Sequence, residues 1–518
     1  MSSIQKNSNS NGTSPIREVK VSIPRIVLEQ PDAHPLGKAI ETFVSRSMDI
    51  AWACSIAVPN AQTAQLRLLR KIARQQKNLL EQITSSSGTK QAEATAAMLD
   101  NDRNIDLIAN SKMPSTIVAG LFIGLFCEFD NFVGEFIRGV AHLDETRFYH
   151  LKREVTIGEL KGLATIDELR DDLLEKDIES LRRESYPKQF QQLEKDYDLQ
   201  LTKFDEWPSF VEASQRRNLF THAGGVTSDQ YRQVCLANGN LEKDIPPKGT
   251  LLPLDPTYFF AAHKAVERTG VMLGYTLWRK IFPRDPDIAD RHLNELIYNR
   301  LRLEDFATAL RFSNFGLSQP FVKPTSGVMR RMRIVNKAIA LKRLNRGAEA
   351  ISTLDGEDWS GTVRDFSLAQ AVLRDNYAEA AALMRKIGKE GEFVTDGGYR
   401  NWPLFWHFRK SEEFLKAYKD VFGYSFSETV TSEVRDSEAG TTSPKPAAKK
   451  AQGKHQPVAR TGKKEPGVTK TTTRKKTTVR KDAIVEKKKS HETKGRTATP
   501  DKKRIHRPVR DKRSRSTS

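Results

Sequence analysis

An arginine and a histidine five positions apart, Arg217 and His222, are the residues of this 518-residue chain best suited to chemistry. Arginine presents a planar fork of donors that clamps a phosphate, and histidine exchanges a proton near neutral pH. Together they could position a phosphodiester and move a proton during its cleavage. Asn218, directly after the arginine, could fix the orientation of either side chain. Gly224 and Gly225 are typical of a helix end that leaves room for a ligand.

The segment around this pair resembles the signature of the HEPN superfamily. That signature is an arginine, a polar residue, three variable positions and a histidine, and here it spans Arg217 to His222. The double arginine at Arg216 and Arg217 and the run HAGGVTSDQY from His222 onward carry the resemblance further. It implies an all-helical domain with a four-helix core, and many domains of this superfamily are metal-independent ribonucleases. An endoribonuclease of defence or toxin type is the function that the resemblance favours.

The resemblance also implies a dimer, because the arginine and histidine of two subunits face one another across the interface in this family. The RNA's own 2′-hydroxyl would then be the nucleophile, so we expect neither a cofactor nor a metal. His222 would be the general acid or base, and Arg217 would hold the scissile phosphate and stabilise its developing charge. Arg216 is a further candidate contact for nucleic acid.

The same residues also fit an interpretation without catalysis. Arg217 suits the negative end of a helix dipole, and His222 suits an exposed position before a glycine cap. Asp130, which interrupts an apolar stripe, could form an interhelical ion pair with Arg216 or Arg217. A HEPN-like domain can also serve as a nucleic-acid-binding or dimerisation module only.

Apolar periodicity predicts the helices that position the motif. Three segments with steps of three and four residues are 115–142, 157–201 and 258–282. The motif ends a helix between the last two, so we expect a HEPN-like domain over 112–285. Residues 31–111 predict a helical extension with a break at Pro59–Asn60 and a loop at 85–88.

A repeated pattern over 286–425 predicts a helical-repeat module. A leucine, a polar turn and two alanines recur after Leu303, Leu344 and Leu373. Small alanines let paired helices approach closely, as in tetratricopeptide repeats, which this stretch resembles. An ordinary alanine-rich bundle is the alternative. Either arrangement predicts a docking surface for a protein partner or a support for a dimer.

The net charge of +20 lies entirely at the C-terminal end. Residues 440–518 hold 26 Lys and Arg against 6 Asp and Glu, so residues 1–439 are formally neutral. With few large apolar residues, 426–518 predicts a disordered polybasic tail, and 1–30 is also expected to be disordered. The tail should bind DNA or RNA without sequence preference by releasing counterions; a solubilising appendage or a contact with anionic membrane is the alternative. The candidate contacts are Lys449, Lys450, Arg474, Lys475, Lys476, Lys487, Lys488, Lys489, Lys502, Lys503 and Arg504.

Other chemistries have no support in the sequence. Phosphate-loop, dinucleotide, zincin and serine-hydrolase motifs are absent, and three cysteines without CxxC spacing predict neither disulfides nor a zinc site. The longest apolar run, 117–127, predicts no transmembrane segment, and the N-terminus lacks a secretory signal. The sequence thus predicts a mostly α-helical protein of the cytoplasm, with a HEPN-like core, a helical extension, a repeat module and disordered termini. Its tail could bring it to the nucleoid or to chromatin.

Overall fold

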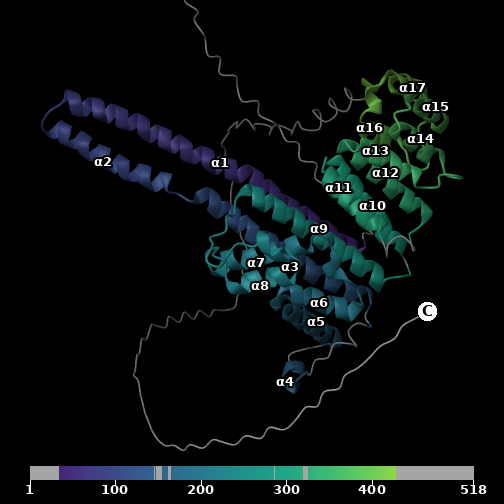
Figure 1. The fold of residues 1–518 in the computed structure, drawn as a ribbon, viewed down its shortest axis with the longest axis horizontal. Helices are drawn as coiled ribbons and strands as arrows, with labels where there is room; N and C mark the ends of the chain where they lie inside the picture. The colour runs from purple at the N-terminus through teal and green to yellow at the C-terminus, as the bar shows by residue number, and fades with distance from the viewer. Residues whose placement is uncertain are drawn as a thin grey trace, which may run out of the picture. The chain divides into compact units, whose positions relative to one another are not determined.

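The computed structural model describes residues 34–144, 146, 155–161, 165–284, 286–318 and 325–427. Within these ranges the chain is mostly α-helical, as the sequence predicts, and contains no β-strand (Figure 1). The extended pairing found there is one isolated antiparallel bridge between Val226 and Leu251. Nearly all of the termini expected to be disordered, 1–30 and 426–518, lies outside the described residues.

One group of described helices precedes residue 285, and α7 within this group carries the motif. They are α1 (Pro35–Ser85), α2 (Thr89–Ala109), α3 (Met113–Leu143), α4 (Ile157–Leu160), α5 (Ile166–Arg183), α6 (Tyr186–Tyr197), α7 (Trp207–His222), α8 (Asp229–Ala237) and α9 (Pro256–Ile281). The helices after it are α10 (Pro286–Arg302), α11 (Phe306–Leu317), α12 (Gly327–Arg343), α13 (Gly347–Asp355), α14 (Arg364–Leu373), α15 (Tyr377–Ile387), α16 (Asp396–Asn401) and α17 (Glu412–Phe422). Short 3-10 helices lie at Leu201–Lys203, Glu242–Asp244, Pro403–Phe405 and Phe408–Lys410.

Helices α1, α3 and α9 form the centre of the core around the motif. The apolar stripe predicted over 115–142 lies on α3, where Phe122 and Phe126 are fully buried. Phe43 of α1 stacks on Phe132 of α3 with 4.8 Å between the ring centroids. The part of α1 before Pro59 therefore contributes to the same core as α3 and α9. The part after it pairs with α2 in a long helical hairpin (Figure 1).

The predicted break at Pro59–Asn60 is wrong, because α1 continues through both residues. A proline inside a helix removes one backbone hydrogen bond and crowds the carbonyl four residues earlier, here that of Ser55. Ser55, Pro59 and Asn60 are all exposed, so water can hydrate the carbonyl that loses its partner. Val58 is buried beside them and continues the packing face of the helix.

Helix α9 packs closely against α1 because glycines face that helix. A Cβ atom on Gly270 would lie 2.5 Å from Cε1 of Phe43, and one on Gly274 would lie 3.0 Å from Ile40. Both distances are shorter than van der Waals contact, so a larger residue would push the helices apart. The same helix also contacts α3, α7, α10 and α11. Its position therefore sets the position of α7, which carries the motif.

Helices α10 to α15 form three consecutive pairs joined by the same turn. Glu304, Asn345 and Asp375 occupy equivalent places with φ of 59°, 60° and 59°, in the left-handed region. The next residue in each turn donates its backbone N–H to the carbonyl five positions earlier. These bonds are Asp305 to Arg300 (3.0 Å), Arg346 to Leu341 (2.9 Å) and Asn376 to Ala371 (2.9 Å). The repeated sequence pattern over 286–425 thus corresponds to a repeated structural unit.

One apolar stretch of the described chain, Thr89–Leu143, is long and apolar enough to cross a membrane by length and composition alone. Most of its apolar character comes from α3. Phe122, Leu125, Phe126 and Phe129 of that helix are all fully buried against other helices of the chain. Packing within the protein therefore accounts for the apolar face of α3.

We predict that Gly270→Ala destabilises the protein by about 1–3 kcal/mol, because the new methyl group overlaps Phe43 and forces α1 from α9. Urea denaturation measures the free energy of unfolding. Gly120→Ala is the control, since Gly120 is exposed within α3 and has nothing within 4 Å of its added Cβ. That change should stabilise the helix by about 0.5–1 kcal/mol. Equal effects of the two changes would contradict the importance of the α1–α9 contact.

Candidate functional site

Helix α7 carries the whole motif and is anchored at its beginning by an ion pair. Glu206 directly precedes the helix, and its two carboxylate oxygens accept hydrogen bonds of 2.6 Å each from Nε and Nη2 of Arg311 in α11. Trp207 and Phe210 in the first turn are buried in the core. The position of α7 is therefore set both by its apolar face and by a two-point contact with the repeat helices.

The glycines after His222 end α7, as the sequence predicts. Gly224 and Gly225 have φ of 58° and 83°, and the backbone N–H of Gly225 donates to the carbonyl of Leu219 at 3.0 Å. A Cβ on Gly225 would lie 2.9 Å from the ring of Phe220, whereas one on Gly224 would meet no described atom within 4 Å. His222 is the last helical residue and is exposed. The end of α7 thus presents an imidazole with open space beside it.

Arg217 points towards α3 and is only partly paired. Its Nη2 lies 4.0 Å from Oδ2 of Asp130, and its Nη1 donates to Oδ1 of Asn218 at 3.2 Å. Its buried Nε has no hydrogen-bond partner in the part of the chain that the structure describes. The interhelical pair that the sequence suggests for Asp130 is therefore made with Arg217 and not with Arg216. The Arg217 side chain is 24% exposed.

Asp130, whose carboxylate faces that guanidinium, is partly buried. The hydroxyl of Tyr186 in α6 donates to its Oδ1 at 2.8 Å. Burial raises the pKa of the Asp130 carboxyl, and this effect outweighs the opposite effects of the Tyr186 hydrogen bond and of the nearby charges of Arg217 and Arg182. Burial thus disfavours the charged form of the carboxyl that faces Arg217.

Arg216 has a different environment although it is adjacent in the sequence. Its Nε donates to Oε1 of Glu212 at 2.8 Å, and its Nη1 donates to the carbonyl of Pro253 at 2.9 Å. Its guanidinium carbon lies 3.7 Å from the centroid of the Tyr258 ring. The sequence predicts a nucleic-acid contact for Arg216, and the structure corrects this. Because the residue is only 8% exposed and its donors are used inside the protein, it is a structural cation.

Glu212 is the residue that the sequence analysis missed. Besides Arg216, its carboxylate accepts hydrogen bonds from the hydroxyls of Tyr231, at 2.7 Å, and Tyr258. Burial, followed by the charge of Glu212, raises the pKa of both phenols, so they remain donors. The spacing of four residues between Glu212 and Arg216 on one helix face was the available signal. A cavity of about 530 Å³ between α7 and α9 is lined by Glu212, Arg216 and Tyr258 among other residues.

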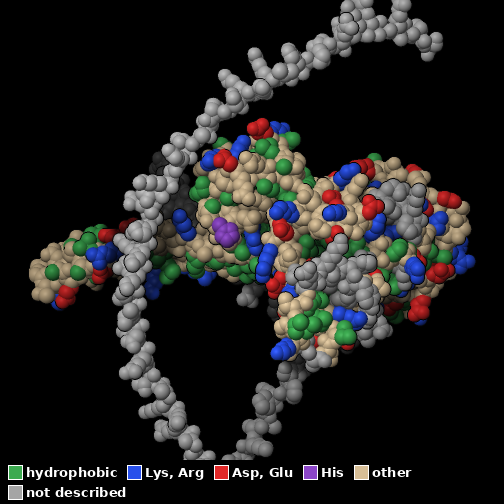
Figure 2. All heavy atoms as spheres, turned by 90° about the horizontal axis from the view of Figure 1, so that it is seen from below, with side chains coloured by type: hydrophobic (Ala, Val, Ile, Leu, Met, Phe, Trp, Pro, Cys, Tyr) green, Lys and Arg blue, Asp and Glu red, His purple; other side chains and the backbone are tan. Residues whose placement is uncertain are grey.

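The structure brings Arg217 and Asn218 into contact near the end of α7. No hydrogen bond within the described chain joins either of them to His222. The candidate contacts in the tail, from Lys449 to Arg504, lie outside the described residues. On the face drawn in Figure 2, Lys and Arg side chains are interspersed with Asp and Glu, in line with the neutral charge of residues 1–439. Among the described residues, no group of three or more His, Cys, Asp or Glu could hold a metal ion.

Comparison with known proteins gave no match: no protein-family model fits the sequence, and neither a characterised protein nor a solved structure is significantly similar to the chain.

The raised pKa of Asp130 predicts a pH dependence. A carboxyl whose pKa is higher in the folded protein than in the unfolded chain adds stability below its unfolded pKa of about 4, and this stability is lost as the pH rises through the folded value. Asn cannot ionise but still accepts the bond from Tyr186. The free energy of unfolding of the wild type minus that of Asp130→Asn should therefore fall between about pH 4 and neutrality.

Urea denaturation at a series of pH values measures this difference. Asp177→Asn, at an exposed position in α5, is the matched control. A wild type that gains stability over Asp130→Asn as the pH rises would contradict the prediction, since the ion pair with Arg217 would then outweigh the cost of burial.

Proposed function

We propose that this chain is a metal-independent endoribonuclease whose site is formed by Arg217, Asn218 and His222 at the end of α7. The observation that carries the proposal is the contrast between the two adjacent arginines. Arg216 is 8% exposed and hydrogen-bonded inside the protein, whereas the side chain of Arg217 is 24% exposed and lies on the same helix end as an exposed histidine. An arginine and a histidine in this setting suit a phosphodiester.

The proposed reaction uses the RNA 2′-hydroxyl as the nucleophile. Its oxygen forms a bond to the adjacent phosphorus, the bond from phosphorus to the 5′-oxygen of the next nucleotide breaks, and a 2′,3′-cyclic phosphate and a 5′-hydroxyl result. One imidazole takes the proton from the 2′-hydroxyl, and a protonated imidazole gives one to the leaving oxygen. Arg217 binds the non-bridging oxygens and stabilises the charge that develops on them. Asn218, which accepts from Arg217, holds that guanidinium in place.

A second copy of the chain completes this site. One subunit offers a single histidine at the end of α7, and the acid and base steps use two. We propose a homodimer in which two α7 ends face one another across a two-fold axis, as the HEPN resemblance implies. The polybasic segment after residue 440 would raise the local concentration of RNA at the dimer. Such an enzyme would act in the cytoplasm, and its tail could bind it to the nucleoid or to chromatin.

We predict that the purified full chain cleaves labelled RNA in the presence of a metal chelator. His222→Ala should lower the rate by about 10²–10⁴, because it removes the proton carrier. Arg217→Ala should lower it by about 10²–10³, because it removes the group that stabilises the phosphate charge. The matched control is His142→Ala, at an exposed position in the last turn of α3, which should leave the rate unchanged. No cleavage by the wild type, or equal cleavage by His222→Ala, would refute the catalytic proposal.

The second candidate function is a non-catalytic nucleic-acid-binding or scaffolding protein that uses this fold for dimerisation. The observation that favours it is the carboxylate of Asp130, 4.0 Å from Arg217, which competes with a phosphate for the guanidinium. Binding would then depend on the tail rather than on α7.

For this second candidate we predict that deletion of 440–518 abolishes binding to RNA and DNA, because it removes the whole excess positive charge. Fluorescence anisotropy with a labelled oligonucleotide at several salt concentrations measures the affinity. Wild-type binding should weaken steeply with salt, whereas His222→Ala should bind like the wild type. Salt-sensitive binding that survives the deletion would contradict the role of the tail.

A further inference from the structure

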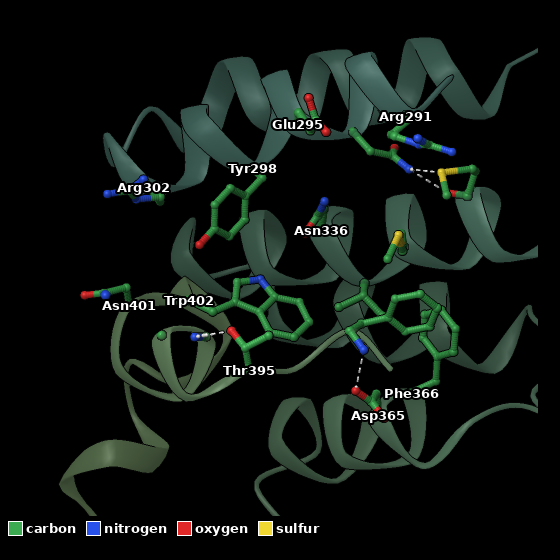
Figure 3. Close-up of a pocket in the computed structure, with 17 residues that line it drawn as sticks. Arg291, Glu295, Tyr298, Arg302, Asn336, Asp365, Phe366, Thr395, Asn401 and Trp402 are labelled. Carbon is green, nitrogen blue, oxygen red and sulfur yellow. Dashed lines mark hydrogen bonds between the residues drawn. The ribbon is translucent and has the colours of Figure 1, made fainter. Parts of the chain in front are cut away.

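A cavity of about 600 Å³ opens between the repeat helices, far in sequence from the α7 motif. One side is the face of α10 that carries Tyr298 and Arg302, and the floor comes from α12 and α14. The segment around α16 supplies the remaining wall (Figure 3). Its volume lies within the range of roughly 300–1,000 Å³ that small-molecule sites occupy.

The two ends of this cavity differ in chemistry. Figure 3 shows Tyr298, Arg302, Asn401 and Trp402 gathered at one end and Phe366 at the other. The apolar lining of the cavity comes from Met329, Met332, Val335, Phe366 and Phe393. Methionine thioethers adapt to the outline of a bound apolar group, and the phenyl rings offer flat surfaces to it.

The cavity also holds polar side-chain groups that form no hydrogen bond with another described residue. The buried Nε1 of Trp402 has no hydrogen-bond partner in the described chain. Asn336, which is 6% exposed, makes no side-chain hydrogen bond to any described residue, and the same is true of the Tyr298 hydroxyl. Buried polar groups in folded proteins nearly always have a partner, because an unpaired one costs about 1–3 kcal/mol. Among the described residues of this cavity, the indole N–H of Trp402 is such a group and points to a ligand that pairs with it. Asn336 and the partly exposed Tyr298 line the same cavity and offer further polar atoms.

Two arginines lie at or behind the Tyr298–Trp402 end, and a third, Arg291, lines the cavity on the side of Phe366 (Figure 3). Arg302 forms no ion pair among the described residues, and its guanidinium lies 6.0 Å from the centroid of the Tyr298 ring. Behind the wall, Nε of Arg409 donates to the carbonyl of Tyr399 at 2.8 Å and its Nη2 donates to that of Trp402. No described carboxylate pairs with Arg409, and burial lowers its pKa to about 10. An anionic group at this end would therefore meet a favourable potential.

The carboxylates of the cavity lie elsewhere. Oδ1 of Asp365 accepts the backbone N–H groups of Phe393 and Val394, at 2.8 and 2.7 Å, next to the apolar end. Glu295 is exposed on α10. Neither residue makes an ion pair with Arg302 or Arg409, so the positive end stays without a counter-ion in the described chain.

We propose that this cavity is a binding site for an aromatic monocarboxylate, with the carboxylate at the Tyr298–Trp402 end and the ring between the methionine and phenylalanine side chains. The indole N–H of Trp402, the carboxamide of Asn336 and the guanidinium of Arg302 bind the anion. The aromatic body excludes water from the apolar end. This site is separate from the proposed ribonuclease site and does not depend on it.

The test is titration of the purified full chain with 1-naphthylacetate by isothermal titration calorimetry, with 1-naphthylacetamide as the neutral counterpart and decanoate as the aliphatic one. We expect 1-naphthylacetate to bind at least about tenfold more tightly than the amide, because only the anion gains the charge-assisted bonds. It should also bind more tightly than decanoate, whose chain cannot stack on the rings.

Two variants locate the binding. Trp402→Phe keeps a ring but removes the N–H, and Asn336→Leu keeps the volume but removes the carboxamide. Each should weaken 1-naphthylacetate binding by about tenfold or more. Trp406→Phe is the matched control at an exposed tryptophan outside the cavity and should bind like the wild type. Circular dichroism and thermal unfolding establish that each variant is folded.

Three results would overturn the proposal. The first is the absence of binding of 1-naphthylacetate to the wild type at millimolar concentration. The second is an affinity for the amide or for decanoate that equals that for 1-naphthylacetate. The third is an unchanged affinity in folded Trp402→Phe and Asn336→Leu, which would place the ligand elsewhere on the protein.

Discussion

The contact between α9 and α1 is the interaction on which the arrangement of this protein depends. Gly270 and Gly274 remove the side chains that would hold the two helices apart. Helix α9 then extends the core to the repeat helices through buried ion pairs, from Glu267 to Arg300 (2.8 Å) and from Arg279 to Asp290 (2.6 Å). A buried charge that loses its partner costs about 3–5 kcal/mol, so these pairs hold α10 strictly in register with α9.

The packing of the same core determines which side chains of α7 are exposed. Successive residues of a helix point about 100° apart, so one of the two adjacent arginines turns towards α9 and the other towards α3. Glu212, Pro253 and Tyr258 contact the first, whereas the second contacts the partly buried carboxylate of Asp130 and the carboxamide of Asn218. The glycine cap then leaves His222 at an open helix end. Arg217 is therefore the more exposed of the two cations.

The repeat helices show how a regular turn produces an irregular cavity. The left-handed residues Glu304, Asn345 and Asp375 give the three helix pairs the same geometry. Helix α16 and its flanking segments interrupt this regularity and bring Trp402 over the face of α10 and α12. Donors from the regular and the irregular parts therefore meet at one place. Such a meeting follows from the path of the chain after residue 388 and not from the repeat itself.

The sequence by itself determined the helical class, the stripe on α3, the end of α7 at Gly224 and the repeated turns, because these depend on residues close together in the chain. It also indicated Asp130 as a partner for an arginine. It failed at Pro59, where local exposure lets a helix continue through a proline, and at Arg216, whose burial depends on residues of α9 and the loop before it. Tertiary packing alone decided which of the two arginines is more exposed, that Glu212 binds two tyrosine hydroxyls, and that Trp402 lies near Tyr298. Each of these features requires side chains from segments distant in sequence to meet in one low-dielectric space.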